Sequence, residues 1–476
     1  MRPRAPLLAL AAIVAAGLAL RIVYASQSLL GDELFTLDHA SAGSFGAMMD
    51  SADRVEYTPP LYFVLAWLAA KAGDPQTAIR VPAIVLGTAT IPLVYLLARR
   101  AAEGLGARAA AAGLVAATAF ALSPFALFYG SEARSYGAAA FSVALAAVLL
   151  LEALRRERAR GWWIGFAAAL AAIALSHYTA IAAALWLAAW AAYARRDRLR
   201  PLVAACAAAA AAFLVWVPFA PTFSSPDVVG AFWPLTLSNV ASAAARSLYG
   251  VNPPVALGDA PGLLPAIALT AIALAAAAAA AARLWSDGLP SPLGLVAGLA
   301  LVTPVALLAY SLVSTDIFVA RSLFPTAPAA FAVIGVGLAT LPRPALAACA
   351  VVGVIALGAG ALAANGPDAR RPQYEQAAAF IERETRPADP VLDAEVFPER
   401  APRRALEIHL SRPVIETDVG DPRPALRRAG RAAVAGFPSV RGAEAFDLPP
   451  QAGLRLVERR VFRGSVDLHV AIYARP

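Results

Sequence analysis

Apolar runs of about 20 residues recur along the first 364 residues of the chain, separated by short polar stretches. A run of that length is sufficient to cross the roughly 30 Å of hydrocarbon in a bilayer as a helix. We expect the first run to be an uncleaved helix, because it is as long as a full span and lacks a clear cleavage site of small residues. The pattern predicts eleven membrane-spanning helices, at residues 5–25, 79–98, 109–128, 135–154, 162–177, 179–194, 201–220, 262–283, 292–312, 319–341 and 345–363.

One further apolar segment, at residues 59–72, is too short to count as a span. It has about 14 residues, whereas a spanning helix needs about 20. We expect it to lie along the membrane surface or to re-enter the membrane, within a single large loop at residues 26–78.

The composition agrees with a membrane protein. Charged residues make up 15% of the chain and hydrophobic residues 60%, whereas soluble domains carry about 25% charged residues. The net charge of +8 comes largely from arginines in short loops between apolar runs, so it is no sign of nucleic-acid binding. Both cysteines, Cys206 and Cys349, lie in apolar segments, and we expect no disulfide framework.

Basic loops predict the orientation of the helices. Residues 1–4, 99–108, 155–160 and 195–200 are rich in arginine, and loops of this kind face the cytoplasm. This orientation makes the chain a multi-pass protein of the plasma membrane with a cytoplasmic N-terminus. The large loop at residues 26–78 and the C-terminal tail would then both be extracytoplasmic.

The composition changes at residue 365, beyond which charged residues are dense and no apolar run is long enough to span. Apolar residues at helical spacing predict an amphipathic helix at residues 373–386. Short strands are predicted at residues 390–392, 413–415, 454–462 and 468–473. The chain is therefore expected to be an all-α polytopic membrane domain at residues 1–364, followed by a small extracytoplasmic mixed α/β domain at residues 365–476.

With this orientation, unusual polar residues gather on the outer side. Each has a plainer explanation: an acidic pair suits a loop or a helix N-terminus, buried arginines can extend to the interface, neighbouring charges can pair, and a histidine can cap a helix. Their shared location favours a functional site, because the orientation was assigned from other residues. The residues are Asp32, Glu33, Tyr57, Thr58, Tyr62, Arg80, Glu132, Arg134, Tyr136, His177 and Arg321.

These residue types suit the transfer of a group from a lipid phosphate to a hydroxyl. Arginine binds phosphate through a planar, permanently charged fork. A carboxylate can remove the proton from an attacking hydroxyl. Arginines can also stabilise the negative charge that grows on a departing phosphate. A phosphate held at the edge of the bilayer suggests a lipid phosphate.

The order of four short motifs resembles that of the GT-C glycosyltransferases. The motifs are Gly31-Asp32-Glu33, Thr58-Pro59-Pro60-Leu61-Tyr62, Ala78-Ile79-Arg80-Val81-Pro82 and Glu132-Ala133-Arg134-Ser135-Tyr136. The chain is similar in particular to the glycosyltransferase 39 type, which is related to protein O-mannosyltransferases and to the aminoarabinose transferase of lipid A. The resemblance covers residues 5–200 and continues weakly through residues 321–325.

The resemblance implies a polyprenyl-phosphate sugar donor, a catalytic loop at residues 26–78 and an inverting transfer. Asp32 would be the general base, and Glu33 would orient the acceptor or support the base. The donor phosphate would be bound by Arg134, Arg80 and Arg321, in decreasing order of motif support. The substrate cavity would be lined by Glu132, Tyr57, Thr58, Tyr62, Tyr136 and His177, with Glu132 tethering Arg134 or contacting the acceptor.

Two positions depart from the pattern of the family. Relatives often carry Lys or His at the position of Thr58, and Tyr at the position of Ser322. The first departure removes or changes a contact to phosphate or acceptor, and the second weakens the case for Arg321. Some relatives use a divalent cation and others do not; the sequence has no clear metal cluster, so we assign no metal site and leave a divalent cation open as a cofactor.

The predicted acceptor is a hydroxyl of a lipid, a glycan or a protein, and neither it nor the sugar is identified by the sequence. One alternative is a transporter or flippase of lipid-linked sugars, although such proteins place polar sites near the membrane midplane and often have internal repeats. The other is a non-catalytic membrane scaffold with an external binding domain. A flippase would form no new glycosidic bond, and a scaffold would tolerate replacement of the acids and Arg134.

Overall fold

The computed structural model describes residues 4–29, 31–56, 58–219, 235–249, 263–314, 316–367, 369–393, 405–416, 423–437 and 453–476. The chain divides into two units. The first comprises Met1–Ala25, Asp38–Val251 and Leu257–Ala363, and the second comprises Ser26–Leu37, Asn252–Ala256 and Ala364–Pro476. Each unit is described by itself below.

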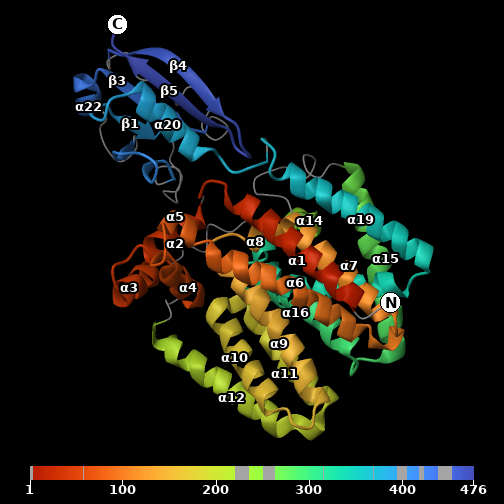
Figure 1. Ribbon diagram of the computed structural model, residues 1–476. Helices are drawn as coiled ribbons and strands as arrows, with labels where there is room; N and C mark the ends of the chain where they lie inside the picture. The colour runs from red at the N-terminus through yellow and green to blue at the C-terminus, as the bar shows by residue number, and fades with distance from the viewer. Residues whose placement is uncertain are drawn as a thin grey trace. The chain divides into compact units, whose positions relative to one another are not determined.

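Long apolar helices make up most of the first unit (Figure 1). Among the described residues, eight helical segments are long and apolar enough to cross a membrane. They contain α1 (Arg4–Ala25), α6 (Val81–Ala101), α9 (Tyr136–Arg155), α12 (Leu199–Trp216), α15 (Leu263–Asp287), α16 (Pro292–Val313), α18 (Ala327–Thr340) and α19 (Arg343–Ala363). The protein is therefore an integral membrane protein, as the sequence predicts.

Shorter apolar helices account for the other predicted spans. These are α7 (Arg108–Leu122), α10 (Arg160–Ser176) and α11 (Ile181–Ala194), so every predicted span coincides with an apolar helix. The segment at residues 59–72 forms α4 (Leu61–Ala70), whose 10 residues would extend only about 15 Å. A helix of that length cannot cross the hydrocarbon by itself.

Two predicted spans are interrupted in the structure. The span at residues 109–128 breaks at Ser123, whose extended backbone separates α7 from α8 (Pro124–Tyr129). A residue before proline is disfavoured in the helical region, and the Ser123 hydroxyl caps the new helix at the amide of Ala126, 3.4 Å away. The span at residues 319–341 is divided into α17 (Ala320–Leu323), η5 (Phe324–Thr326) and α18.

Small residues allow these helices to pack with their backbones in contact. A Cβ atom added at Gly335 of α18 would lie 2.4 Å from the carbonyl oxygen of Ala112 in α7. One added at Gly337 would lie 1.9 Å from the carbonyl oxygen of Ala276 in α15. Membrane helices associate largely by such close packing, because burial of apolar surface gives little driving force inside lipid.

The loop between α1 and α6 contains four short helices. They are α2 (Asp32–Ala40), α3 (Phe45–Val55), α4 and α5 (Pro75–Ala78). Ser44 caps α3 and Asp74 caps α5, each accepting a hydrogen bond from a backbone amide three residues ahead. The loop is thus ordered by local helix signals as well as by packing.

The second unit contains a five-stranded sheet in the order β2-β1-β3-β5-β4 (Figure 1). The strands are β1 (Val391–Asp393), β2 (Val414–Glu416), β3 (Arg431–Gly436), β4 (Arg455–Phe462) and β5 (Leu468–Ala474). β1 pairs in parallel with β2 and β3, whereas β5 pairs antiparallel with β3 and β4. This arrangement confirms the predicted mixed α/β fold of the C-terminal region.

Helix α20 (Tyr374–Glu384) buries its apolar face in this unit and agrees with the predicted helix at residues 373–386. Helix α22 (Arg423–Arg428) and strand β3 were not predicted. The sequence of β3 is Arg-Ala-Ala-Val-Ala-Gly, and alanine and glycine have little preference for strands. The strand forms because it lies in the centre of the sheet, where small side chains are buried on both faces.

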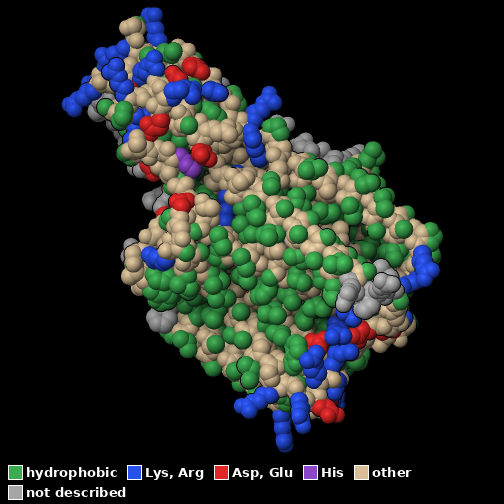
Figure 2. Space-filling model, in the orientation of Figure 1, with side chains coloured by type: hydrophobic (Ala, Val, Ile, Leu, Met, Phe, Trp, Pro, Cys, Tyr) green, Lys and Arg blue, Asp and Glu red, His purple; other side chains and the backbone are tan. Residues whose placement is uncertain are grey.

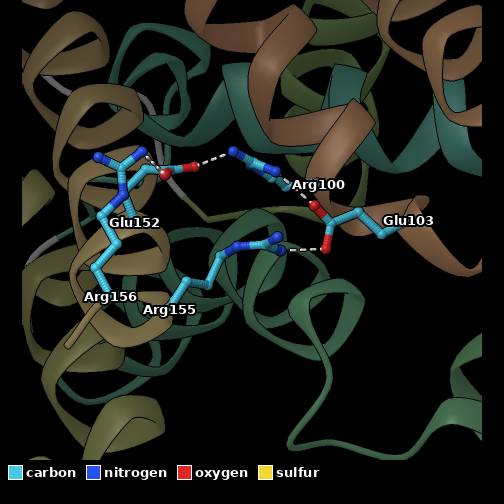
Figure 3. A network of polar contacts seen from close by, with 5 residues as sticks. All are labelled: Arg100, Glu103, Glu152, Arg155 and Arg156. Carbon is cyan, nitrogen blue, oxygen red and sulfur yellow. Dashed lines mark hydrogen bonds and ion pairs between the residues drawn. The ribbon is translucent and has the colours of Figure 1, made fainter.

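Hydrophobic side chains cover much of the visible surface of the first unit, and basic side chains gather at one end of it (Figure 2). An ionic network joins the loop after α6 to the end of α9 (Figure 3). Arg100 contacts Glu103 at 2.6 Å and also pairs with Glu152. Arg156 contacts Glu152 at 2.8 Å, and Arg155 pairs with Glu103. Two of the basic loops therefore lie on the same side of the bundle.

The third basic loop is joined to the same end. Arg195 donates a hydrogen bond of 2.8 Å to the carbonyl oxygen of Leu154, near the end of α9. The three loops that were predicted to share one side of the membrane are thus neighbours in space.

Replacing Glu152 with Gln should destabilise this end of the bundle. The Glu152 side chain is 8% exposed and serves two arginines, and the loss of a charged partner from a buried hydrogen bond costs roughly 1–3 kcal/mol. We expect a lower thermal midpoint for Glu152→Gln in detergent, measured by tryptophan fluorescence. Glu157→Gln, an exposed position in the loop that follows α9, is the matched control, and equal midpoints for the two variants would contradict the role of Glu152.

Candidate functional site

The acidic pair Asp32 and Glu33 begins helix α2. Gly31 precedes it with a φ of 55°, a conformation that other residues rarely adopt. Carboxylates in the first turn of a helix are stabilised by the helix dipole. The plainer explanation of the pair, as a helix N-terminus, therefore holds for the local structure. Asp32 is half-buried, whereas Glu33 is fully buried.

Glu33 forms an ion pair with Arg371, and both residues belong to the second unit. The side chains of Arg371 and Glu33 are 8% and 0% exposed, respectively. Buried opposite charges must be paired, because an isolated charge in an apolar environment is very costly. The Glu33 carboxylate is therefore engaged within the protein, which favours a supporting role over direct contact with a substrate.

Arg134 forms the central ion pair of the first unit. Its guanidinium donates two hydrogen bonds to the Glu56 carboxylate, one to Oε1 and one of 2.8 Å to Oε2. A two-pronged contact of this kind fixes the plane of the guanidinium. The sequence allows a local pair between Glu132 and Arg134, but the bidentate partner of Arg134 comes from the loop between α3 and α4.

The other contacts of Glu56 come from the same loop region. The Nε2 atom of His39 lies 3.6 Å from Glu56 Oε1, and its Nδ1 atom lies 2.8 Å from the Ser51 hydroxyl. Thr58 donates a hydrogen bond of 3.4 Å to Glu56 Oε2. The Phe63 ring lies against both His39 and Arg134, with 5.2 Å between ring centroids and 5.6 Å from the centroid to the guanidinium carbon.

Glu56 is held in its ionised form. Burial by itself raises the pKa of the carboxyl, but the charge and hydrogen bonds of Arg134 and the contact with His39 outweigh it and lower the pKa to about 2. Glu56 is therefore a fixed negative partner for Arg134 at any physiological pH.

Further predicted residues gather around Arg134 from other segments. The ring of Tyr136 lies 5.3 Å from the ring of His177 and 5.3 Å from that of Tyr129. α17, which carries Arg321, reaches the turn of His177, where the Thr179 hydroxyl donates a hydrogen bond of 3.4 Å to the carbonyl oxygen of Ser322. The Tyr129 ring lies 5.6 Å from that of Phe324, three residues after Arg321. The structure thus brings together Glu132, Arg134, Tyr136, His177 and Arg321.

His177 lies in the tight turn between α10 and η2 (Tyr178–Ala180). Its Nδ1 atom lies 2.8 Å from the Thr179 hydroxyl and accepts a hydrogen bond of 3.3 Å from the Thr179 amide. The histidine therefore caps this turn, as its plainer explanation proposed, while its ring also packs against Tyr136.

Arg80 and Tyr62 connect the loop to the bundle. Arg80 is 4% exposed and donates a hydrogen bond of 2.7 Å to the carbonyl oxygen of Ala25, the last residue of α1. Carbonyl groups at a helix C-terminus lack partners within the helix, and a cation there is favourable. The hydroxyl of the fully buried Tyr62 donates to the carbonyl oxygen of Ile79 at 2.8 Å. Tyr57 lies outside the described residues.

Helices α6 and α9 run from the residues around Arg134, at one end of the bundle, to the basic loops at the other end. α6 begins after Arg80 and reaches Arg100 of the ionic network, and α9 begins at Tyr136 and ends at Arg155. These helices have 21 and 20 residues, which corresponds to about 30 Å. The cluster around Arg134 and the basic loops therefore lie at opposite ends of the bundle, as the predicted orientation requires.

Sequence reasoning missed several residues of this region. Glu56 lies two residues before the motif at residues 58–62, and its closeness to that motif was the available signal, although other charged residues precede it. His39 lies on the same helix as the acidic pair, seven positions after Asp32. Arg371 and Arg246, the latter acting on Tyr129, carry no local signal.

An apolar cavity of about 170 Å³ lies elsewhere in the first unit. It is formed by residues of α7, α15, α18 and α19 together with one residue of α14 (Leu237–Tyr249). Leu114, Leu269, Phe331 and Leu357 are among its lining side chains. Such a surface suits a hydrocarbon chain.

Across the described parts of the chain, no group of three or more His, Cys, Asp or Glu side chains is placed to hold a metal ion.

Residues 57–224 match the family model described as dolichyl-phosphate-mannose-protein mannosyltransferase. No curated protein matches the chain in sequence.

Solved structures resemble the whole chain. ArnT from Cupriavidus metallidurans in the apo state is 16% identical, with 97% of each chain covered and a TM-score of 0.58. The same protein bound to undecaprenyl phosphate is 14% identical over 97% of each chain, with a TM-score of 0.59. AglB from Archaeoglobus fulgidus, in complex with an inhibitory peptide and a dolichol-phosphate, is 12% identical, with a TM-score of 0.50 over 95% of this chain and 72% of that one. These likenesses confirm the predicted GT-C fold.

The ionisation of Glu56 predicts a specific pH dependence of stability. Its pKa is about 2 in the folded protein against an ordinary value of 4.5, so ionised Glu56 contributes stability that is complete above pH 4.5 and is lost as the pH falls toward 2. The thermal midpoint of Glu56→Gln in detergent should therefore fall less steeply than that of the wild type between pH 5 and pH 3. Parallel pH profiles for the two proteins would contradict the assignment of Glu56 as a buried ionised partner.

Proposed function

We propose that this chain, a membrane glycosyltransferase of the GT-C fold, moves a sugar from a polyprenyl phosphate to a hydroxyl group on the extracytoplasmic side of the membrane. The observation that carries the proposal is the convergence of Arg134, Tyr136, His177 and the segment of Arg321, from three separate parts of the chain, at the end of the bundle remote from the basic loops. The acceptor is a hydroxyl of a lipid, a glycan or a protein.

The donor class is supported by chemistry and by the related structures. ArnT is known with bound undecaprenyl phosphate, and AglB with a dolichol-phosphate. Arginines suit the phosphate of such a carrier, since they keep their charge at the membrane surface and bind oxygen atoms through a planar fork. The apolar cavity offers a surface of the kind that an isoprenoid tail needs.

Arg134 and Arg321 are the proposed phosphate ligands. Glu56 holds the guanidinium of Arg134 through two hydrogen bonds, which limits its motion before a donor binds. Arg321 adds a second positive charge in the same neighbourhood. Arg80 is the third candidate, although one of its donors already serves the end of α1.

Asp32 is the proposed general base. The acceptor oxygen attacks the anomeric carbon of the sugar while the bond from that carbon to the phosphate oxygen breaks. The acceptor proton passes to the Asp32 carboxylate, and the bonding electrons leave with the polyprenyl phosphate, whose added negative charge the arginines stabilise. A single displacement of this kind inverts the anomeric configuration. Glu33 supports the base from a buried position.

The basic loops support the proposed orientation. Arginine-rich loops face the cytoplasm, and the end of the bundle that carries them is about 30 Å away from the cluster around Arg134. A site outside the cytoplasm suits a lipid-linked donor, because nucleotide sugars are made inside. A flippase of lipid-linked sugars is the alternative, and it would move its substrate without forming a new glycosidic bond.

Replacing Asp32 with Asn should abolish transfer. Glycolipids and envelope glycans from cells with and without the protein would first be compared by mass spectrometry to identify the product. Membranes containing Asp32→Asn should then form at least 100-fold less of that product, because the hydroxyl loses its base. Asp50→Asn, an exposed position in α3, is the control; normal product formation by Asp32→Asn would remove Asp32 as the base.

Replacing Arg321 with Gln should weaken both donor binding and turnover. Removal of one group that stabilises a developing negative charge typically lowers the rate about 100-fold or more. We expect weaker binding of undecaprenyl phosphate, measured by isothermal titration calorimetry, together with the loss of rate. Arg99→Gln removes the same charge in the last turn of α6, at the end of the bundle that carries the basic loops. This control should leave donor binding and turnover unchanged. If both variants bind undecaprenyl phosphate like the wild type, Arg321 is no phosphate ligand.

A further inference from the structure

The segment that carries the acidic pair is packed with the C-terminal part of the chain. Residues Ser26–Leu37 belong to the same unit as Ala364–Pro476. Leu29 and Leu34, on either side of the acidic pair, are 5% and 2% exposed. The position of Asp32 is therefore linked to a region more than 300 residues away in sequence.

A short series of polar contacts ties this segment to residues 365–371. The side chain of Gln27 donates to Asn365 Oδ1 at 2.9 Å and accepts a hydrogen bond of 2.9 Å from the backbone amide of Arg371. The Arg371 guanidinium pairs with Glu33 and also donates to the carbonyl oxygen of Ser28 at 3.4 Å. Arg371 thus contacts the segment through both its backbone and its side chain.

Arg371 is in turn fixed by the hairpin of the C-terminal sheet. The carbonyl oxygen of the preceding residue, Arg370, accepts a hydrogen bond of 2.7 Å from the amide of Ser465, between β4 and β5. The side chain of Gln373 donates to the carbonyl oxygen of Arg463 at 2.7 Å. A Cβ atom added at Gly464 would lie 3.1 Å from Pro372, so the hairpin backbone lies directly against this stretch.

The Glu33–Arg371 pair is the strongest of these contacts in chemical terms. Both side chains are buried, and a charge-assisted hydrogen bond away from water is stronger than one between neutral groups. Glu33 is the immediate neighbour of Asp32 in the first turn of α2. Whatever fixes the Glu33 side chain also fixes the backbone from which the Asp32 carboxylate projects.

We propose that Arg371 is a positioning residue, through which the C-terminal domain holds the Asp32 carboxylate in place for transfer. This inference rests on the proposed role of Asp32 as the base. It gives the C-terminal domain a function in catalysis that requires no contact between the domain and the acceptor. The phosphate ligands proposed above belong to the first unit, so loss of the Glu33–Arg371 pair should impair turnover and spare donor binding.

Four variants of the full-length protein in membranes test the proposal. Arg371→Gln removes the charge, Arg371→Lys keeps the charge and loses the planar fork, and Glu33→Gln removes the partner. Arg370→Gln, the neighbouring arginine of the same segment, is the matched control. We expect kcat to fall at least tenfold in Arg371→Gln and Glu33→Gln and to be partly restored in Arg371→Lys. The donor KM and the affinity for undecaprenyl phosphate should stay within twofold of the wild type, as they should in Arg370→Gln.

Hydrogen exchange provides a measurement that does not depend on the assay of sugar transfer. Amides of residues 32–37 should exchange faster in Arg371→Gln and Glu33→Gln than in Arg370→Gln, while amides of α6 and α9 stay protected. Unchanged exchange at residues 32–37 in both pair variants, or a kcat equal to that of Arg370→Gln, would overturn the proposal. Loss of donor affinity in step with kcat would also overturn it, because that result indicates general damage to the fold.

The failure of the proposed base can be told apart from the failure of this inference. If Asp32→Asn keeps its activity, the role of Asp32 as the base is wrong, whatever the Arg371 variants do. If Asp32→Asn is inactive while Arg371→Gln turns over like the wild type, the base stands and the positioning role falls.

Discussion

Charges that are buried among apolar helices must find partners inside the protein, and this constraint organises the molecule around its candidate site. Among the described residues of the first unit, three arginines are buried, and they meet this constraint in different ways. Arg134 takes a carboxylate, Glu56. Arg80 donates a hydrogen bond to the carbonyl oxygen of Ala25 at the end of α1. Arg21, fully buried in α1, donates to the carbonyl oxygen of Gly17 at 3.0 Å and lies 5.7 Å from the centre of the Phe120 ring. The contacts of Arg134 and Arg80 each join two segments. The hydrogen bond of Arg21 lies within α1, and it is the contact with the Phe120 ring that joins this side chain to α7.

The fold follows from the sequence to a large extent because the membrane imposes simple rules. Apolar runs of sufficient length must be helical, since no water is present to satisfy the backbone. The predicted spans accordingly all coincide with apolar helices, and the short segment at residues 59–72 forms α4, which is too short to cross. Strand β3 was missed because its alanines are set in a strand by neighbours on both sides, which local preference does not reveal.

The sequence indicated which residues gather in the candidate site, but it gave little indication of which charged residues pair with one another. Glu132, Arg134, Tyr136, His177 and Arg321 are brought together as the motif order suggested. The partner of Arg134 is Glu56, 78 residues away, and the partner of Glu33 is Arg371, 338 residues away. Nothing in the local sequence distinguishes these partners from other acids and arginines, because only the folded chain decides which charges share a buried space. Glu33 was expected to orient the acceptor or to support the base, and its burial beside Arg371 favours the second of these roles.

The distance along the chain between Glu33 and Arg371 has a consequence for biosynthesis. The first helix and the acidic pair leave the ribosome early, but their partner follows 338 residues later. At the usual synthesis rate of about 5–20 residues per second, the first loop waits roughly 20–70 s for its partner. During that interval Glu33 has no Arg371 to pair with, and the turn that carries Asp32 lacks its final support. A chain that stops before residue 371 would therefore carry the acidic pair without the partner that fixes it.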